Sequence, residues 1–195
     1  MSNLKIFNFG LPRTGTTSFH NFILSNNIRS LHSNKDEIDR IFPIEYSNYI
    51  EDKPSLIDNY IESYSCFNDC PWYSLSEKII SKYYQNKNIY FVATIRDHKD
   101  WIISFTKIQK WLMKSPNNIL YHTYIYGDIV KDIRLNQNKL IDFYHKFYMQ
   151  LDILQNKYNV KITRLDLSDT TKIVQIIQQI IPIFNTEYPH DNKSI

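Results

Sequence analysis

A chain of 195 residues, of which 43% are hydrophobic, is long enough for one domain with a full core, which we predict to span residues 1–195. This composition excludes an intrinsically disordered chain. The formal net charge of +3 is too small to indicate nucleic-acid binding, and no uncharged apolar stretch approaches the roughly 18 residues of a membrane-spanning helix.

The first third of the chain alternates apolar runs with amphipathic segments. Residues 4–9 (LKIFNF) are an apolar run that ends at a glycine, which predicts a buried strand. Apolar residues at helical spacing predict a helix over 16–24, and residues 28–32 predict a second short strand. Residues 34–50 are polar with spaced apolar positions, which indicates a helix, and residues 64–67 predict a third strand.

The middle of the chain contains a continuous run of β-favouring residues. This run, IYFVATI at 89–95, predicts a strand that is buried on both faces of the sheet. A helix is predicted on each side of it, over residues 74–84 and 97–112. Ser74 and Asp97 stand at the starts of these helices, where their side chains can cap the first N–H groups.

The last part of the chain continues this alternation after one segment without a clear pattern. We interpret residues 115–134 as an insertion on the substrate side. A long helix is predicted over 140–158, a fifth strand over 160–167 and a last helix over 173–181. Strands that alternate with helices predict an α/β fold, a three-layer domain whose mostly parallel sheet has about five strands flanked by helices.

Polar and charged residues follow the predicted strands at their carboxyl ends. These positions are residues 10–17, His32, Asp69, Arg96 and Asp166. In open sheets of this kind, ligands bind beyond the carboxyl ends of the strands. The pattern therefore predicts a binding site at this edge of the sheet.

The stretch GLPRTGTTSFH, which begins at Gly10, joins the first strand to the first helix. Backbone N–H groups and the helix dipole make such a turn an anion site. Gly10 and Gly15 keep the separation of the glycines in a nucleotide-binding phosphate loop, and Thr17 occupies its Ser/Thr position. Thr16 replaces the lysine of that motif, so Arg13 supplies the positive charge. The alternative is a plain strand–helix turn with capping threonines.

The part PRTGTTS of this loop resembles the 5′-phosphosulfate loop of PAPS-dependent sulfotransferases, whose usual form is P-[KR]-[ST]-G-T-[TS]. PAPS is 3′-phosphoadenosine 5′-phosphosulfate. The resemblance implies a P-loop kinase-like topology, PAPS as cofactor, PAP as product and no metal, which would account for the missing lysine. It also implies a set of residues that hold the 5′-phosphate: Arg13, Thr14, Gly15, Thr16, Thr17 and Ser18.

A second motif of that family is a strand, an arginine, and a helix with a serine eight residues after the arginine. The stretch FVATIRDHKDWIISF is similar, with Arg96 and Ser104 at that separation. The resemblance implies that both side chains bind the 3′-phosphate of the nucleotide. The alternative is a salt bridge between Arg96 and Asp100, with Ser104 facing solvent.

The chain resembles one subgroup of this family over most of its length. Its members read GLPRTGTTSLH at the loop, carry D-x-P and R-D-x-x-x-W-x-x-S, and often close with F-P-H-x-N-K. Here Asp69 begins the D-x-P motif, Trp101 stands between Arg96 and Ser104, and the chain closes with YPHDNK, ending at Lys193. The resemblance implies Lys193 as a further cofactor-binding residue.

Sulfuryl transfer passes a group in line between two atoms, so catalysis rests on positioning, charge stabilisation and a base for the acceptor. The resemblance implies that Arg13 stabilises the leaving phosphate. Many relatives have lysine there, which can also donate a proton, whereas arginine cannot readily do so. Asp69 is our first candidate for the general base and His32 the second. The alternatives are a helix cap for Asp69 and a structural histidine that bonds the loop for His32.

These observations together predict a sulfotransferase that acts on a hydroxyl or amine of a small molecule or glycan. A nucleotide-binding module without transfer activity and an atypical P-loop kinase, which would need Mg²⁺, are the alternatives. Cys66 and Cys70 match neither the common redox spacing nor half of a zinc site. We therefore predict free thiols and a cytoplasmic location.

Overall fold

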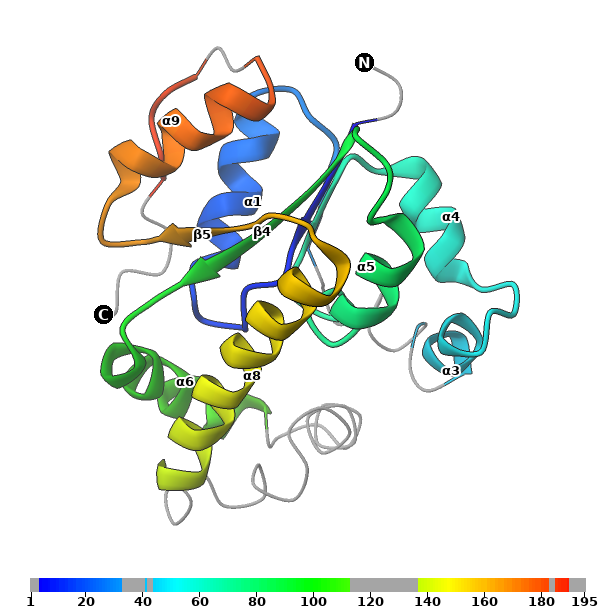
Figure 1. Cartoon of the computed structure of the whole chain (residues 1–195). Coiled ribbons are helices and arrows are strands. Elements are labelled where there is room, and N and C mark those ends of the chain that lie inside the picture. The colour runs from blue at the N-terminus through cyan, green and yellow to red at the C-terminus, as the bar shows by residue number, and fades with distance from the viewer. Residues whose placement is uncertain (1–3, 33–40, 42–43, 113–136, 183–184, 190–195) are drawn as a thin grey trace.

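A computed structural model of the chain describes residues 4–32, 41, 44–112, 137–182 and 185–189. The structure has a central sheet with helices packed against both of its sides (Figure 1). The segment that we interpret as an insertion on the substrate side lies outside the described residues.

The described strands form one parallel sheet in the order β2-β3-β1-β4-β5. Their bounds are β1 (Lys5–Asn8), β2 (Ser30–His32), β3 (Cys66–Asn68), β4 (Ile89–Ile95) and β5 (Ile162–Asp166). The predicted α/β fold with a P-loop kinase-like topology is confirmed. The first strand lies at the centre of the sheet with the third strand beside it, so the loops that follow these strands are neighbours.

The described helices follow the predicted alternation with one addition. Their bounds are α1 (Thr16–Ser25), α3 (Ile44–Ile50), α4 (Leu56–Ser63), α5 (Ser76–Tyr83), α6 (His98–Leu112), α8 (Gln137–Tyr158) and α9 (Thr170–Ile180). Helix α4 was not predicted. It begins with a capping box in which Ser55 and Asp58 satisfy each other's backbone N–H groups.

The two predicted helix caps have different outcomes. Asp97 precedes α6, and its Oδ1 accepts a hydrogen bond from the Lys99 N–H at 2.9 Å, so this cap is confirmed. The prediction that Ser74 caps α5 is wrong. The helix begins two residues later, and the Ser74 hydroxyl instead donates to the Pro71 carbonyl at 2.7 Å.

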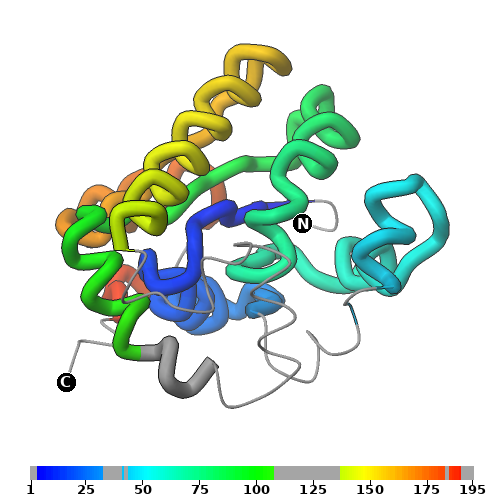
Figure 2. The backbone as a smooth tube through the Cα atoms, turned by 90° about the horizontal axis from the view of Figure 1, so that it is seen from below, coloured from blue at the N-terminus to red at the C-terminus, as the bar shows by residue number. Residues whose placement is uncertain are grey.

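Different helices cover the two faces of the sheet. Ile6 of β1 belongs to a buried cluster with α1 and α9, whereas its neighbour Phe7 belongs to a cluster with α3, α4, α5 and α8. Successive side chains of a strand point to opposite faces, so a strand covered on both sides reads as a continuous apolar run. Figure 2 shows α5 and α8 on one side of the strands and α1 on the other. This arrangement confirms the three layers.

A third apolar cluster lies beyond the carboxyl ends of the strands. It contains Leu11 from the loop after β1, Cys70 from the loop after β3, Trp101 from α6 and Tyr144 from α8. The cluster therefore packs two loops of the predicted site against two helices. Loops without such packing are usually mobile, so these contacts hold the site in place.

Candidate functional site

A side chain from inside β1 shapes the first turn of the site. Asn8 is fully buried, and its Oδ1 accepts hydrogen bonds from the N–H groups of Gly10 and Thr94, both at 3.0 Å. Its Nδ2 donates to Asn68 Oδ1 at 3.0 Å. One amide thus joins the carboxyl ends of β1, β3 and β4, because these strands are neighbours in the sheet.

The loop closes on itself through Thr14, which is fully buried. Its hydroxyl donates to the Leu11 carbonyl at 2.6 Å and lies 3.0 Å from Thr94 Oγ1, and its N–H donates to the same carbonyl at 3.1 Å. The donors of Thr14 are thus used inside the loop. The structure gives Thr14 a role in shaping the turn, and its direct contact with a phosphate stays a prediction.

The two glycines of the loop stand where a side chain would collide. A Cβ atom at Gly10 would overlap Thr94 Oγ1 and would lie 2.8 Å from the Thr94 carbonyl oxygen. Gly15 has a φ of 92°, and a Cβ atom there would overlap the side chain of Leu167. Only glycine fits both the space and the backbone conformation at this second position.

Helix α1 begins directly after Gly15 and presents its N-terminus to the site. Gly15 has no side chain that could cap the helix, and the first N–H groups of any helix lack partners within it. The first turn of α1 contains no acidic residue. Thr16 and Ser18 are buried, whereas Thr17 is half-buried. The N–H groups and the dipole therefore favour an anion at this position.

Arg13 lies at the tip of the loop with a φ of 73°. Its Nε donates to Ser104 Oγ on α6 at 3.0 Å. Burial lowers the pKa of Arg13, the positive charge of Arg96 lowers it further, and the charge of Asp69 raises it. An arginine keeps its proton at neutral pH in spite of such a shift. Two guanidinium charges are therefore held close enough to repel each other.

Arg96 follows β4, and α8 holds its backbone. The Tyr144 hydroxyl donates to the Arg96 carbonyl and accepts from the Arg96 N–H at 3.4 Å. Within the described part of the chain, neither Arg96 nor Arg13 forms an ion pair with a carboxylate, and this includes Asp100. Paired positive charges without a carboxylate partner suit an anion with several oxygens.

Asp69 and His32 meet where β3 and β2 end. His32 Nε2 lies 3.6 Å from Asp69 Oδ2, and the two side chains keep 19% and 15% of their surface exposed. The Thr16 hydroxyl donates to Asp69 Oδ2 at 3.2 Å and lies 3.3 Å from His32 Nε2. The Thr17 hydroxyl lies 3.3 Å from the same nitrogen. The start of α1 thus connects this pair to the phosphate loop.

The backbone of Asp69 aims its carboxylate toward the loop. Its φ is 66°, and its Oδ1 accepts a hydrogen bond from the Cys70 N–H at 2.8 Å. The N–H of Trp72 bonds to the Asp69 carbonyl rather than to its carboxylate. The carboxylate therefore binds its own turn through one oxygen and faces Thr16 and His32 through the other, instead of capping a helix.

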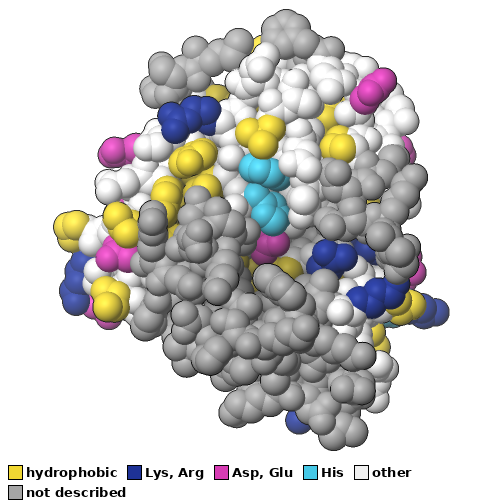
Figure 3. All heavy atoms as spheres, turned by 180° about the vertical axis from the view of Figure 1, so that it is seen from behind, with side chains coloured by type: hydrophobic (Ala, Val, Ile, Leu, Met, Phe, Trp, Pro, Cys, Tyr) yellow, Lys and Arg dark blue, Asp and Glu magenta, His cyan; other side chains and the backbone are white. Residues whose placement is uncertain are grey.

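His20 lies behind this pair, one helical turn into α1. Its Nδ1 is 2.9 Å from Ser30 Oγ, and its ring centroid is 5.4 Å from that of His32. Burial, and then the positive charge that His32 can carry, lower the pKa of His20 to about 4. His20 is therefore neutral at pH 7 and packs against the site. Figure 3 shows histidine side chains beside one another at the surface of this face, with acidic and basic groups nearby.

The structure brings most of the predicted site residues to one edge of the sheet. They come from separate parts of the chain: Arg13, Gly15, Thr16, Thr17, His32, Asp69, Arg96 and Ser104. Ser104 is only 1% exposed and contacts Arg13, so it does not face solvent. Lys193 lies outside the described residues.

Two residues of the site were not predicted. Asn8 interrupts the apolar run LKIFNF, and this interruption was a usable signal because a buried polar side chain needs partners. Tyr144 had no comparable signal. Its contact with Arg96 depends on how α8 packs against the end of β4, which the local sequence does not specify.

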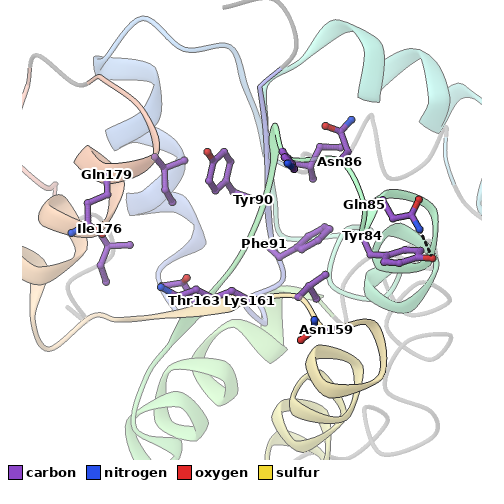
Figure 4. A pocket seen from close by; sticks show the side chains of 14 residues that line it. Tyr84, Gln85, Asn86, Tyr90, Phe91, Asn159, Lys161, Thr163, Ile176 and Gln179 are labelled. Carbon is purple, nitrogen blue, oxygen red and sulfur yellow. Dashed lines mark hydrogen bonds between the residues drawn. The ribbon is translucent and has the colours of Figure 1, made fainter.

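A cavity of about 380 Å³ lies near the opposite edge of the sheet (Figure 4). Tyr90 and Phe91 line it from the start of β4, Lys161 and Thr163 from β5 and its preceding turn, and Gln179 from α9. The phosphate loop and the two arginines discussed above do not line this cavity. We therefore place the candidate site at the carboxyl edge, where the charged groups converge.

In the described ranges, His, Cys, Asp and Glu side chains do not gather in groups of three or more that could hold a metal ion. None of the helices in those ranges combines the length and apolarity that a bilayer crossing requires.

Comparison with known proteins identifies one family. The family model described as a sulfotransferase domain matches residues 5–194, which is nearly the whole chain. The match includes the phosphate loop, the end of β4 and the helix that follows it. No match was found among curated proteins.

Proposed function

The chain belongs to the sulfotransferase family, and on that premise we propose that it transfers a sulfuryl group from PAPS to a hydroxyl or amine, with PAP as the second product. We propose a small molecule or a glycan as the acceptor. We further propose a single domain over residues 1–195 and a cytoplasmic location. Cys66 and Cys70 are buried and form no disulfide bond with each other, which agrees with a reducing environment.

The observation that carries this proposal is the pair of guanidinium groups beside an open helix N-terminus. Arg13 and Arg96 interact unfavourably with each other and have no carboxylate partner among the described residues. Such repulsion is relieved when a multiply charged anion binds. PAPS carries phosphate groups at two ends of a nucleoside. Its 5′-group suits the loop with Arg13, and its 3′-phosphate suits Arg96.

PAPS supplies an activated sulfuryl group, whose bond to the 5′-phosphate oxygen breaks as the bond to the acceptor atom forms. Arg13 stabilises the negative charge that develops on the leaving phosphate oxygen. The N–H groups at the start of α1 hold the same phosphate in line with the acceptor. Arg13 stays protonated, so it acts through its charge rather than by proton transfer.

The acceptor needs a group that accepts its proton as the new bond forms. Asp69 is our proposed base, because its side chain keeps 15% of its surface exposed and its Oδ2 is oriented by the Thr16 hydroxyl. His32, which lies 3.6 Å from that oxygen, is the second candidate and can stabilise the protonated carboxyl. Asp69→Asn should lower kcat by roughly 100-fold or more while PAP still binds. A larger loss in His32→Asn than in Asp69→Asn would reverse these two roles.

The test of the whole proposal is a thermal-shift titration with PAP and PAPS against ADP and Mg-ATP. Ligand at 100 times its dissociation constant stabilises a protein by about 2.7 kcal/mol, which gives a measurable rise in Tm. We expect this rise with PAP and PAPS, and we expect Arg96→Ala to lose it. Arg29→Ala is the matched control, because this arginine stacks over the ring of Tyr64, away from the site.

Each other outcome of this titration identifies a different function. A Tm rise with Mg-ATP alone would overturn the proposal in favour of an atypical P-loop kinase. Binding of PAP and PAPS without transfer to a broad panel of hydroxyl and amine acceptors would favour a nucleotide-binding module. Turnover is followed by the release of PAP, so a single assay reports on every acceptor in the panel.

A further inference from the structure

Aromatic side chains of α6 and α8 hold the two halves of the proposed nucleotide site together. Trp101 is fully buried, and its Nε1 donates to the carbonyl of Pro12 in the phosphate loop at 2.8 Å. The rings of Trp101 and Tyr144 pack with centroids 5.0 Å apart. The Tyr144 hydroxyl in turn bonds both the carbonyl and the N–H of Arg96. A continuous chain of contacts thus runs from the loop to Arg96.

A second tyrosine, one helical turn along α8, holds a different pair of backbone groups. The Tyr148 hydroxyl donates to the Thr94 carbonyl at 2.8 Å and lies 3.5 Å from the Leu11 N–H. Its ring packs on that of Tyr144 with centroids 4.7 Å apart. Tyr148 therefore bonds the loop and the end of β4, whereas Tyr144 bonds the backbone of Arg96.

Both hydroxyl groups form hydrogen bonds to backbone groups. A hydrogen bond to the backbone fixes the position of the main chain from which the side chain extends. The side chain itself can then still contact a ligand. In Arg96, the N–H and the carbonyl are both held, and the guanidinium has no ion-pair partner among the described residues. Fixing the backbone of an unpaired arginine reduces the entropy lost when an anion binds.

We propose that Tyr144 is a positioning residue that sets the place of Arg96 for the 3′-phosphate, while Tyr148 sets the loop that receives the 5′-phosphate. This inference rests on the proposed function. Tyr144 acts through Arg96 and does not itself contact the nucleotide. Because the two tyrosines act on different phosphates, their substitutions should affect different parts of the nucleotide.

The experiment compares the affinities of PAP and 5′-AMP, which lacks the 3′-phosphate, by isothermal titration. The ratio of the two affinities measures what the 3′-phosphate contributes. In Tyr144→Phe, which loses both hydrogen bonds to the Arg96 backbone, we expect this ratio to fall roughly 3- to 10-fold, with 5′-AMP binding nearly unchanged. Phenylalanine keeps the ring that packs on Trp101, so the loop should stay in place.

Two control variants separate this role from a general loss of structure. In Tyr148→Phe, we expect PAP and 5′-AMP to weaken by the same factor, so the ratio stays as in the unmodified protein. Tyr158→Phe changes the last residue of the same helix, far along α8 from Tyr144, and should alter neither affinity. A wild-type ratio in Tyr144→Phe would overturn the inference. If the unmodified protein bound PAP no better than 5′-AMP, the proposed function itself would fail.

A second measurement does not depend on a substitution. The Arg96 N–H bonds to the Tyr144 hydroxyl without ligand, so its hydrogen exchange should be slower than that of an unbonded amide in the same loop. Exchange of the Arg96 amide, followed by NMR in the unmodified protein, provides this test. Exchange at the rate of an unprotected amide would overturn the inference even if Tyr144→Phe did not fold.

Discussion

The two edges of the sheet carry similar polar side chains in different surroundings. At the carboxyl edge, Asn8 is fully buried and bonds two backbone N–H groups, one from the loop after β1 and one from β4. Near the amino edge, Asn86 is exposed and accepts a hydrogen bond from Asn88, two residues away. The Tyr84 hydroxyl there accepts a bond from its neighbour Gln85. Burial and the distance along the chain between partners, rather than residue type, distinguish the site from the rest of the surface.

Residues with left-handed backbone angles also occur at both edges, but for different structural reasons. Asn27 and Asn159, with φ values of 59° and 50°, follow the ends of α1 and α8, where asparagine commonly terminates helices. Arg13 and Asp69 adopt similar angles at the carboxyl edge without terminating a helix. Arginine has no local preference for this conformation, which costs on the order of 1–3 kcal/mol. Surrounding contacts must therefore hold the loop.

The largest expected difference between the edges concerns backbone fit. Gly10→Ala should lower the free energy of unfolding by about 3 kcal/mol, because the new Cβ would overlap Thr94 Oγ1 and crowd the backbone behind it. Asn159→Gly, at the amino edge, should change it by less than about 0.5 kcal/mol, because glycine suits a left-handed helix end. Urea unfolding of both variants provides the measurement. Equal shifts of the urea midpoint in the two variants would show that backbone fit does not distinguish the two edges.

The second difference concerns buried and exposed asparagine. Asn8→Ala should destabilise the protein by roughly 2–3 kcal/mol, because it leaves the buried N–H groups of Gly10 and Thr94 without their acceptor. Asn86→Ala removes only an exposed local bond and should cost about 0.5 kcal/mol. The same unfolding assay compares them. An Asn8→Ala variant as stable as Asn86→Ala would show that β1 and β4 hold the loop without this amide.

The third difference is a dependence on pH. Folding lowers the pKa of His20 from 6.5 to about 4, so the unfolded chain binds more protons between these values. The contribution of His20 to stability is therefore complete above pH 6.5 and is lost as the pH falls toward 4. The loss should be roughly 1 kcal/mol, since the ring is partly exposed to solvent. Unfolding of the unmodified protein and of His20→Asn, measured at pH 7 and pH 4.5, isolates this contribution. If His20→Asn lost as much stability between pH 7 and pH 4.5 as the unmodified protein does, this contribution of His20 would be excluded.

The smallest expected effect is at the cavity near the amino edge. Lys161 is exposed and lines that cavity. Lys161→Ala should change the free energy of unfolding by less than about 0.5 kcal/mol and the affinity for PAP by less than about twofold. Arg96→Ala should lower the affinity for PAP more than roughly tenfold, as expected when a hydrogen bond from a charged group is lost. A tenfold loss of PAP affinity in Lys161→Ala would place nucleotide binding at the amino edge and would contradict the proposed site.

Local patterns predicted the elements that depend on residues close together in the chain. Strand β4 was predicted with the observed bounds, because a continuous run of seven β-favouring residues fits a strand buried on both faces. Helix α4 was missed, although Ser55 and Asp58 form a capping-box pattern that could have indicated its start. Ser74 was assigned as a cap from its position alone, and its hydroxyl found a nearer acceptor.

The candidate site was predicted as a set of residues but not as an arrangement. The resemblance assigned Ser104 to the 3′-phosphate beside Arg96, and the structure shows it bonded to Arg13. Both residues were predicted to belong to the site, but their contact with each other was not expected. Helix α6 fixes where Ser104 lies, and the packing of Trp101 against the phosphate loop brings that helix close to Arg13.

The sequence by itself determined the phosphate loop, the helix that follows it and the alternation of strands and helices. These features depend on glycine positions, apolar spacing and capping groups within a few residues of one another. Only the tertiary structure decided that His32 meets Asp69 and that Asn8 meets Thr94. The strand order β2-β3-β1-β4-β5 makes neighbours of strands that are distant in the chain, and hydrophobic burial on both faces selects that order.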